Sequence, residues 1–233
     1  KSMVLENLEF LKQFEGKYYD DLPRDLQRRI TQSPITVYVV EKGTPDEVKF
    51  NIFKRINTGG LVLTPQEIRH ALNQGLPAKF IEELSEVPEF REATCYVISS
   101  DRMEDRDFIT RFVSFYIKGP SEYEPDLDSF MTKGMALIKD TTPEYRREMK
   151  RHVIKTMETS IKIFGNDGFR KRESYNARRK PINKALFESL SIGFSKLNDD
   201  ETGRLVERAM IFKDKFIELN KDSKFKYSLS SGT

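Results

Sequence analysis

The segment TTPEYRREMKRHVIKTMETSIKIFG, residues 141–165, decides the fold class of this chain. Its apolar side chains recur at every third or fourth position: Tyr145, Met149, Val153, Met157, Ile161 and Phe164. This spacing places them on one face of an α-helix, and Pro143 suits the first helical turn. The segment therefore predicts a helix of about twenty residues whose apolar face must pack against other helices.

Three further stretches repeat this periodicity: Phe108, Phe112 and Phe115; Ile182, Leu186, Leu190 and Phe194; and Leu205, Ala209, Phe212, Phe216 and Leu219. The first belongs to a helix expected from Glu104 to Lys118, and Gly119-Pro120 ends it. Residues 165–180 have no apolar period and are expected to form a long loop. Because apolar helix faces bury one another, the sequence predicts a mostly α protein with a helical bundle.

The front of the chain predicts a smaller α+β part. Residues 35–40, ITVYVV, are β-branched and aromatic and predict a strand. Thr44-Pro-Asp-Glu47 and Thr64-Pro-Gln-Glu67 are both capping boxes with proline at the first helical position. We expect a domain boundary between Pro88 and Ser100, which gives domains of residues 1–90 and 91–233.

The composition excludes several classes of protein. Among 233 residues, 40 are basic and 37 acidic, so the net charge of +3 does not by itself indicate a nucleic-acid binder. A single cysteine, Cys95, excludes a disulfide framework and any metal site with several cysteines, and its apolar setting predicts a buried, inert thiol. No metal site is predicted. No apolar run is long enough to cross a bilayer, and we expect a soluble, cytoplasmic protein.

The most specific stretch is FKRINTGGLVLTPQEIR, residues 53–69. Gly59 and Gly60 allow a backbone to approach a ligand closely, and the helix that follows offers free N–H groups to an anion. Two arginines, Arg55 and Arg69, have the fork geometry that holds phosphate or carboxylate. The alternative is a helix–loop–helix whose polar residues satisfy one another, with Glu67 serving only as a cap.

The motif Phe53-Lys-Arg-Ile-Asn-Thr-Gly-Gly60, followed by Leu63, Glu67, Arg69 and Leu72, resembles the hallmark of the GmrSD-type restriction-endonuclease N-terminal domain family. That family has a ParB/sulfiredoxin-like core. Weaker matches lie elsewhere: Asp21-Leu22-Pro23 before the predicted strand, Asp105-Arg106-Asp107 before Arg111-Phe112, and residues 182–188, INKALFE. The resemblance runs from about Leu5 to the end of the chain.

The resemblance implies nucleotide binding and hydrolysis in defence against foreign or modified DNA, including phage DNA. Its nucleotide-binding residues here would be Arg55, Asn57, Thr58, Gly59, Gly60, Glu67 and Arg69. The family's Asp-Gly-Gln-Gln-Arg motif is missing, and the chain begins where the residues after that motif would lie. Nucleoside triphosphatase activity, with a divalent cation, is therefore expected only if that motif is supplied. No His-Asn-His nuclease motif occurs, so a nuclease would be a separate partner module, and the catalytic residues stay unknown.

A second candidate site is FRKRESYNARRK, residues 169–180. From Arg170 to Lys184 there are seven basic residues and one acidic residue. Concentrated positive charge with interleaved aromatic residues favours contact with nucleic-acid phosphates. The expected DNA-binding residues are Arg170, Lys171, Arg172, Arg178, Arg179 and Lys180. The alternative is a solvated loop that balances acidic surfaces elsewhere.

Two functions follow from these patterns. The first is a part of a DNA-defence protein that couples nucleotide chemistry, incomplete in this chain, to DNA recognition. The second is a non-enzymatic helical interaction module that docks a protein or nucleic-acid partner through its basic loop. Neither function involves a membrane.

Overall fold

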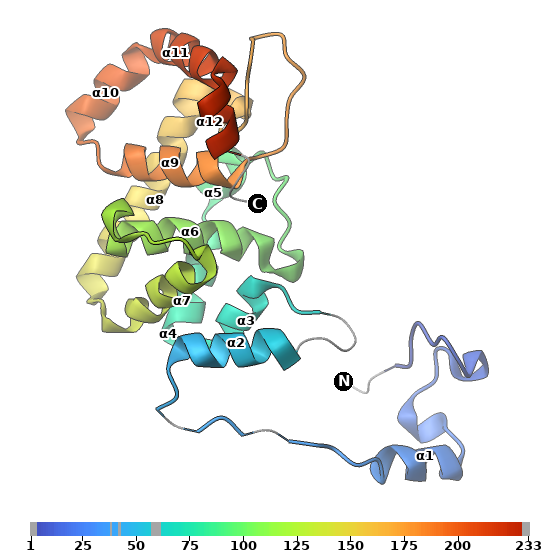
Figure 1. Ribbon diagram of the computed structural model, residues 1–233. Coiled ribbons are helices and arrows are strands. Elements are labelled where there is room, and N and C mark those ends of the chain that lie inside the picture. Colours follow the sequence, from blue (N-terminus) through green and yellow to red (C-terminus); the bar gives the residue numbers. More distant parts are fainter. Residues whose placement is uncertain (1–3, 38, 42, 57–61, 230–233) are drawn as a thin grey trace. The chain divides into compact units, whose positions relative to one another are not determined.

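The computed structural model describes residues 4–37, 39–41, 43–56 and 62–229 (Figure 1). Helices dominate it, as the sequence predicts. In chain order they are α1 (Arg24–Thr31), α2 (Asp46–Ile56), α3 (Pro65–Leu72), α4 (Leu76–Ser85), α5 (Pro88–Ala93), α6 (Glu104–Lys118), α7 (Leu127–Leu137), α8 (Pro143–Phe164), α9 (Lys184–Ser195), α10 (Asp199–Glu207), α11 (Ala209–Lys221) and α12 (Ser223–Ser228). Short 3₁₀ turns lie between several of them.

The chain divides into two compact units, Lys1–Lys42 and Gly43–Thr233. In the first unit, α1 is tied to the turn before it by one side chain. The amide nitrogen of Gln27 donates to the backbone oxygens of Tyr19, Asp20 and Leu22, at 3.2, 3.3 and 2.9 Å. Leu22 is buried, and most other described residues of this unit are exposed. The first unit is therefore held mainly by local hydrogen bonds.

The strand predicted at residues 35–40 has no support in the structure. Among the described residues of that segment, none is in a strand, and Ile35, Val37 and Val39 are 85%, 73% and 82% exposed. Tyr38 lies outside the described residues. A strand needs a neighbouring strand to take its hydrogen bonds and cover one face, and β-propensity alone does not supply that neighbour. Elsewhere in the described ranges, β pairing is limited to isolated bridges between Val4 and Tyr18 and between Arg170 and Ile182.

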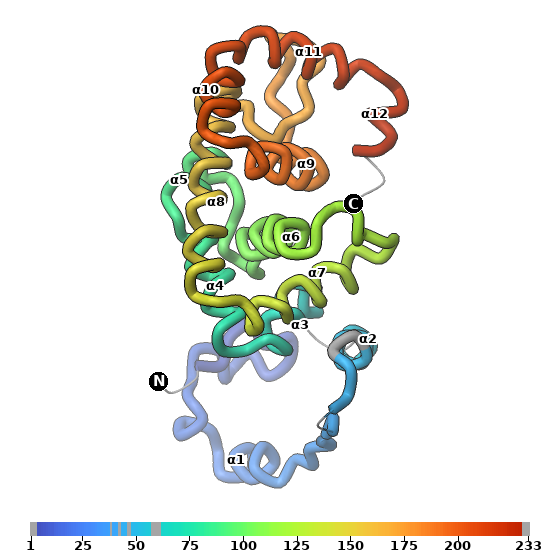
Figure 2. The backbone as a smooth tube through the Cα atoms, turned by 90° about the vertical axis from the view of Figure 1, so that its left-hand side faces the viewer, coloured from blue at the N-terminus to red at the C-terminus, as the bar shows by residue number. Residues whose placement is uncertain are grey.

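The second unit is a helical bundle, which confirms that prediction. Helix α6 lies between α9 on one side and α4 and α7 on the other, while α8 runs along α5 and α9 (Figures 1 and 2). The largest apolar cluster joins α4, α5, α6, α8 and α9 through residues such as Ile81, Phe90, Phe112 and Val153. Phe187 of α9 sits at its centre and packs edge-on against Phe90 and Phe108.

A second apolar cluster connects the C-terminal half of α8 to α9 and α11. It contains Ile163, Phe164, Leu186, Phe194 and Phe216, and Phe164 packs edge-on against Phe216. This cluster fixes both ends of the loop between α8 and α9, because that loop leaves α8 at Phe164 and enters α9 beside Leu186. The helical frame therefore determines where the basic loop can lie.

The helices predicted at Glu104–Lys118 and Tyr145–Phe164 are confirmed as α6 and α8. The stripe from Leu205 to Leu219 is instead divided between α10 and α11, because Arg208 leaves the helical region at φ −99° and ψ 23°. No glycine or proline marks this break in the sequence. Helices α4, α5 and α7 were not predicted, although Pro77, Phe80, Ile81 and Leu84 of α4 have helical spacing and are buried.

Residues on both sides of position 90 belong to one apolar cluster. Ile81 and Leu84 of α4 and Phe90 of α5 pack with Phe108 and Phe112 of α6. The division into domains of residues 1–90 and 91–233 stays a prediction.

Candidate functional site

The basic loop between α8 and α9 is folded by its own arginines. Arg172 donates from Nη1 to the backbone oxygen of Ala177 at 2.8 Å and from Nη2 to that of Tyr175 at 2.7 Å. Its Nη2 also lies 3.1 Å from a carboxylate oxygen of Asp167. Arg172 thus serves the structure of the loop.

Arg170 is buried at the base of this loop, with 4% of its surface exposed. An isolated bridge to Ile182 fixes its backbone, and its Nη1 donates to the backbone oxygen of Lys180. The other two guanidinium nitrogens, Nε and Nη2, are buried and have no hydrogen-bond partner among the described residues. Burial and the positive charge of Arg179 lower the pKa of Arg170, and Cys95 and Asp167 offset this only in part.

Four of the six predicted DNA-binding residues meet in one pocket. Its volume is about 450 Å³, and it is lined by Arg170, Arg178, Arg179 and Lys180 together with Val97 and Pro181. None of these lining residues is acidic, so the pocket attracts anions. The structure thus gathers these cations, which the sequence could show only as neighbours along a loop.

The other two predicted residues do not line this pocket. Arg172 folds the loop as described, and Lys171 donates to the backbone oxygen of Leu229 at 3.4 Å. The side chains at the pocket rim, Arg178, Arg179 and Lys180, are exposed. Arg179 also donates to the backbone oxygen of Asn166 at 2.6 Å, which anchors one side of the pocket.

The predicted nucleotide-binding residues are distributed differently. Arg55 is exposed near the end of α2, while Asn57, Thr58, Gly59 and Gly60 lie outside the described residues. Their role in nucleotide binding stays a prediction.

Glu67 caps α3, as the sequence indicates. It accepts from the backbone N–H of Thr64 at 2.6 Å, and the Thr64 hydroxyl accepts from the backbone N–H of Glu67 at 3.2 Å. The carboxylate also holds Arg102, with its oxygens 2.8 and 2.7 Å from Nε and Nη2. The hydrogen bond from Arg102, with help from Thr64, lowers the pKa of Glu67 to about 2. Glu67 therefore has two structural roles: it caps α3 and it pairs with Arg102.

Arg69 is 1% exposed and belongs to an internal ion network. Its Nε donates to Gln66 at 2.9 Å, its Nη1 to Asp128 at 2.9 Å and its Nη2 to Asp107 at 2.9 Å. Each of its three guanidinium nitrogens thus has an acceptor within the protein. This arrangement matches the alternative in which the polar residues of the motif satisfy one another.

The network continues from Asp107 into α6 and α9. Asp107 accepts from Arg111 at 3.1 Å and from Lys184 at 2.9 Å, and Arg111 also donates to Glu188. Burial raises the pKa of Asp107, but the positive charges of Arg111, Lys184 and Arg69 outweigh it and hold that pKa below its usual value. Burial raises the pKa of Glu188 despite its contact with Arg111. Sequence reasoning offered the alternative in which the polar residues of the motif satisfy one another, but it did not connect Arg69 to α6 and α9, although the i,i+4 spacing of Asp107 and Arg111 was visible.

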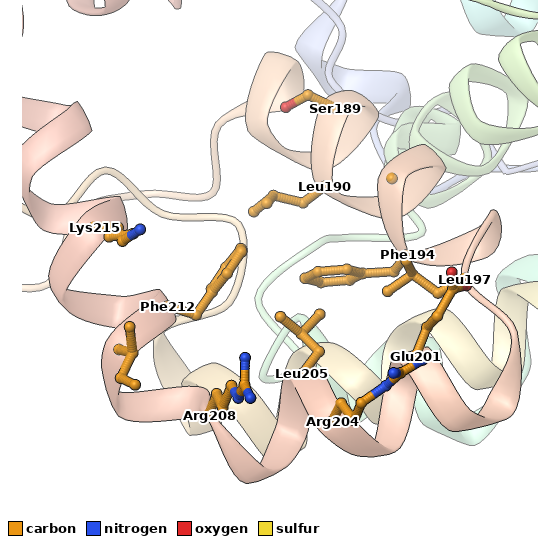
Figure 3. A pocket seen from close by; sticks show the side chains of 12 residues that line it. Ser189, Leu190, Phe194, Leu197, Glu201, Arg204, Leu205, Arg208, Phe212 and Lys215 are labelled. Carbon is orange, nitrogen blue, oxygen red and sulfur yellow. The ribbon is translucent and has the colours of Figure 1, made fainter.

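A wider pocket lies between α9, α10 and α11 (Figure 3). Its volume is about 660 Å³, with apolar walls from residues such as Leu190, Phe194 and Leu205 and with Arg208 and Lys215 at its edge. It exists because the chain turns at Arg208 instead of continuing as one helix, and neither glycine nor proline marks that turn in the sequence.

Cys95 differs from the buried, inert thiol that was predicted. It is only half-buried, its Sγ donates to the backbone oxygen of Asn166 at 3.4 Å, and it lies close enough to Arg170 to influence its pKa. Within the described ranges, no three His, Cys, Asp or Glu side chains gather as a metal site would require. In the same ranges, no helix is long and apolar enough to span a membrane.

No protein-family model, curated protein or solved structure matches the chain. The resemblance to the GmrSD-type family therefore rests on the motif residues alone.

Proposed function

We propose that this chain is the nucleic-acid-binding part of a GmrSD-type DNA-defence protein. Its contact with DNA phosphates would run through Arg178, Arg179 and Lys180. The observation that carries the proposal is the gathering of these exposed cations with Arg170 around one pocket that has no acidic lining residue. Among the described residues, Arg178 and Lys180 form no ion pair, and the contact of Arg179 with Asp167 is long, at 4.0 Å, so this surface can neutralise phosphates with little loss of existing ion pairs.

Other basic clusters of the bundle are less available. On α8, Lys150 lies 2.6 Å from a carboxylate oxygen of Glu83, and Arg147 lies 2.7 Å from one of Glu144. Arg146 donates to the backbone oxygen of Thr141. Binding DNA there would exchange existing bonds for new ones, which favours the loop as the contact surface.

The test is the salt dependence of binding to duplex DNA, measured by fluorescence anisotropy. We expect the triple change Arg178→Ala, Arg179→Ala and Lys180→Ala to weaken binding and to flatten the slope of log K against log salt by about 0.9 for each lost phosphate contact. The control replaces Arg24, Arg28 and Arg29 of α1 by Ala, which removes the same charge from another exposed surface.

Equal losses in both triple variants would show that only total charge matters and would contradict the proposal. Absence of any salt-dependent DNA binding by the parent chain would favour the second function, a helical module that docks a protein partner.

A further inference from the structure

Arg170 differs from the other buried arginines of the second unit. Arg69 and Arg111 are bonded to carboxylates of Asp107, Asp128 and Glu188. Arg170 is buried to the same degree, yet its Nε and Nη2 have no hydrogen-bond partner in the part of the chain that the structure describes. A buried polar group without a partner is rare and costly, because it loses its water and gains nothing in return. The thiol of Cys95 lies close enough to this guanidinium to act as a weak acceptor, but a neutral thiol does not balance the buried charge. The two nitrogens therefore indicate an absent anionic acceptor.

The surroundings of Arg170 specify the charge of that acceptor. Three more cations line the same pocket, Arg178, Arg179 and Lys180. The nearby carboxylate of Asp167 is held by Arg172 at 3.1 Å and lies 4.0 Å from Arg179, so it does not satisfy Arg170. In the described part of the chain no anion reaches Arg170, and the neighbouring positive charges favour one at this place.

The backbone around the pocket is held in an unusual conformation. Cys95 and Tyr96, beside Val97, and Phe169, beside Arg170, all have positive φ, at 56°, 56° and 58°. Residues other than glycine adopt this region at a cost, and such residues concentrate at ligand sites. The bundle thus maintains a strained frame around Arg170 that a simple surface loop would not require.

We propose that this pocket binds a phosphate group through Nε and Nη2 of Arg170, with Arg178, Arg179 and Lys180 closing over its other oxygens. The parallel N–H groups of a guanidinium match two oxygens of a phosphate, and a dianion balances more of the four positive charges than a carboxylate does. The inference deepens the proposed function, on which it rests for the expected source of the phosphate, a nucleic-acid end.

Binding requires a small opening of the pocket, because Nε and Nη2 are covered in the unliganded protein. Residues 178–181, which line the pocket, have no regular secondary structure, and the side chains of Arg178 and Lys180 are exposed. Movement of these two side chains costs little, whereas Arg179 stays bonded to Asn166, and the phosphate then takes the two donors that had no partner.

Cys95 supplies a reporter at this site. It is the chain's sole cysteine and lies beside Arg170. The first experiment measures the rate at which iodoacetamide alkylates the full chain with and without inorganic phosphate, using sodium chloride at the same ionic strength as the reference. We expect phosphate to slow alkylation in a saturable manner.

The decisive variant is Arg170→Met, which keeps the length of the side chain and removes its donors. Losing two charge-assisted hydrogen bonds should weaken the phosphate effect by roughly 10- to 100-fold. Arg170→Lys keeps the charge without the fork and should also lose most of the effect, so it serves if the methionine variant does not fold. Arg29→Met, an exposed arginine of α1, is the control and should behave like the parent.

The second experiment identifies the source of the phosphate. It compares two single-stranded oligonucleotides of one sequence, with a 5′-phosphate or a 5′-hydroxyl group, as protectors of Cys95. Stronger protection by the phosphorylated strand, abolished in Arg170→Met, supports a nucleic-acid end as the ligand. Protection by inorganic phosphate but by neither strand supports a free phosphate compound as the ligand. If the parent chain also shows no salt-dependent binding to duplex DNA, the proposed function fails while the pocket stands.

The opposite failure is distinguishable. The pocket proposal is overturned if phosphate does not slow alkylation of the parent, or if it slows alkylation equally in the parent and in Arg170→Met. If duplex DNA still binds with a steep salt dependence, the proposed function remains.

Discussion

The buried network around Arg69 and the pocket around Arg170 differ in whether their buried guanidinium group is paired. Both centre on an arginine that is almost completely removed from water, at 1% and 4% exposure. Every guanidinium nitrogen of Arg69 meets an acceptor within the protein, whereas two nitrogens of Arg170 meet none among the described residues. A fully paired buried charge makes the loss of one partner costly, whereas a buried charge left unpaired calls for an explanation such as an absent ligand.

The comparison changes how the motif residues are understood. Glu67, Arg69, Asp107, Arg111, Lys184 and Glu188 come from three separate stretches, all of which carry the resemblance to the GmrSD-type family. In the fold, Arg69, Asp107, Arg111, Lys184 and Glu188 form one network across α3, α6 and α9. These residues therefore satisfy one another within the fold, which accounts for them without a ligand.

The largest expected effect is that of Arg69→Met. The variant removes the buried arginine that Asp107 and Asp128 share, although Asp107 keeps Arg111 and Lys184. Breaking a buried pair costs about 3–5 kcal/mol of unfolding free energy. Chemical denaturation followed by circular dichroism measures this loss. A loss below about 1 kcal/mol would mean that the network does not hold α3 to α6. Arg69 would then not differ from Arg170 as a structural residue.

Glu67→Gln tests the edge of the same region. Glutamine can still cap α3, but it cannot pair with Arg102. The folded-state pKa of Glu67, about 2, lies below its ordinary value of 4.5, so ionised Glu67 stabilises the fold above pH 4.5 and this stabilisation disappears as the pH falls towards 2. We expect the parent to be more stable than the variant at neutral pH, by less than the effect of Arg69→Met.

That difference should shrink as the pH falls from 4.5 to 2, in urea denaturation at successive pH values. A difference that stays constant over this range would show that the cap, and not the ion pair, is what the substitution changed.

Arg170→Met should cost little stability. It removes one hydrogen bond, to the backbone oxygen of Lys180, and it also removes a buried charge without a full set of partners. These effects oppose each other, so we expect a change of less than about 1 kcal/mol in phosphate-free buffer. A loss as large as that of Arg69→Met would show that Arg170 is structural and would remove the contrast between the two regions.

Arg147→Ala gives the smallest expected effect. Arg147 and Glu144 pair on the surface of α8, with both side chains mostly in solvent. Such pairs contribute almost nothing, since water and salt screen them. We expect an unchanged midpoint of thermal unfolding. A clear decrease would mean that burial is not what separates the strong ion pairs of this protein from the weak ones.

The helices with strong periodicity were predictable because their pattern is local. The spacing from Tyr145 to Phe164 gives α8, and the Thr64 capping box gives the start of α3. The break at Arg208 and the absence of a strand at residues 35–37 and 39–40 were not predictable, because each depends on what other segments offer as packing or hydrogen-bonding partners.

The sequence by itself determined the helical class, the helix caps and the presence of a basic loop, since each depends on neighbours within a few positions. Tertiary structure alone decided which cations are paired and which are not. Arg69 and Asp107 are 38 positions apart, and the bundle places their nitrogen and oxygen 2.9 Å from each other. The bundle also buries Arg170 where none of the described carboxylates reaches its Nε and Nη2. The sequence alone shows which side chains are charged, but only the packed fold decides which of them lose contact with water and which of them are paired.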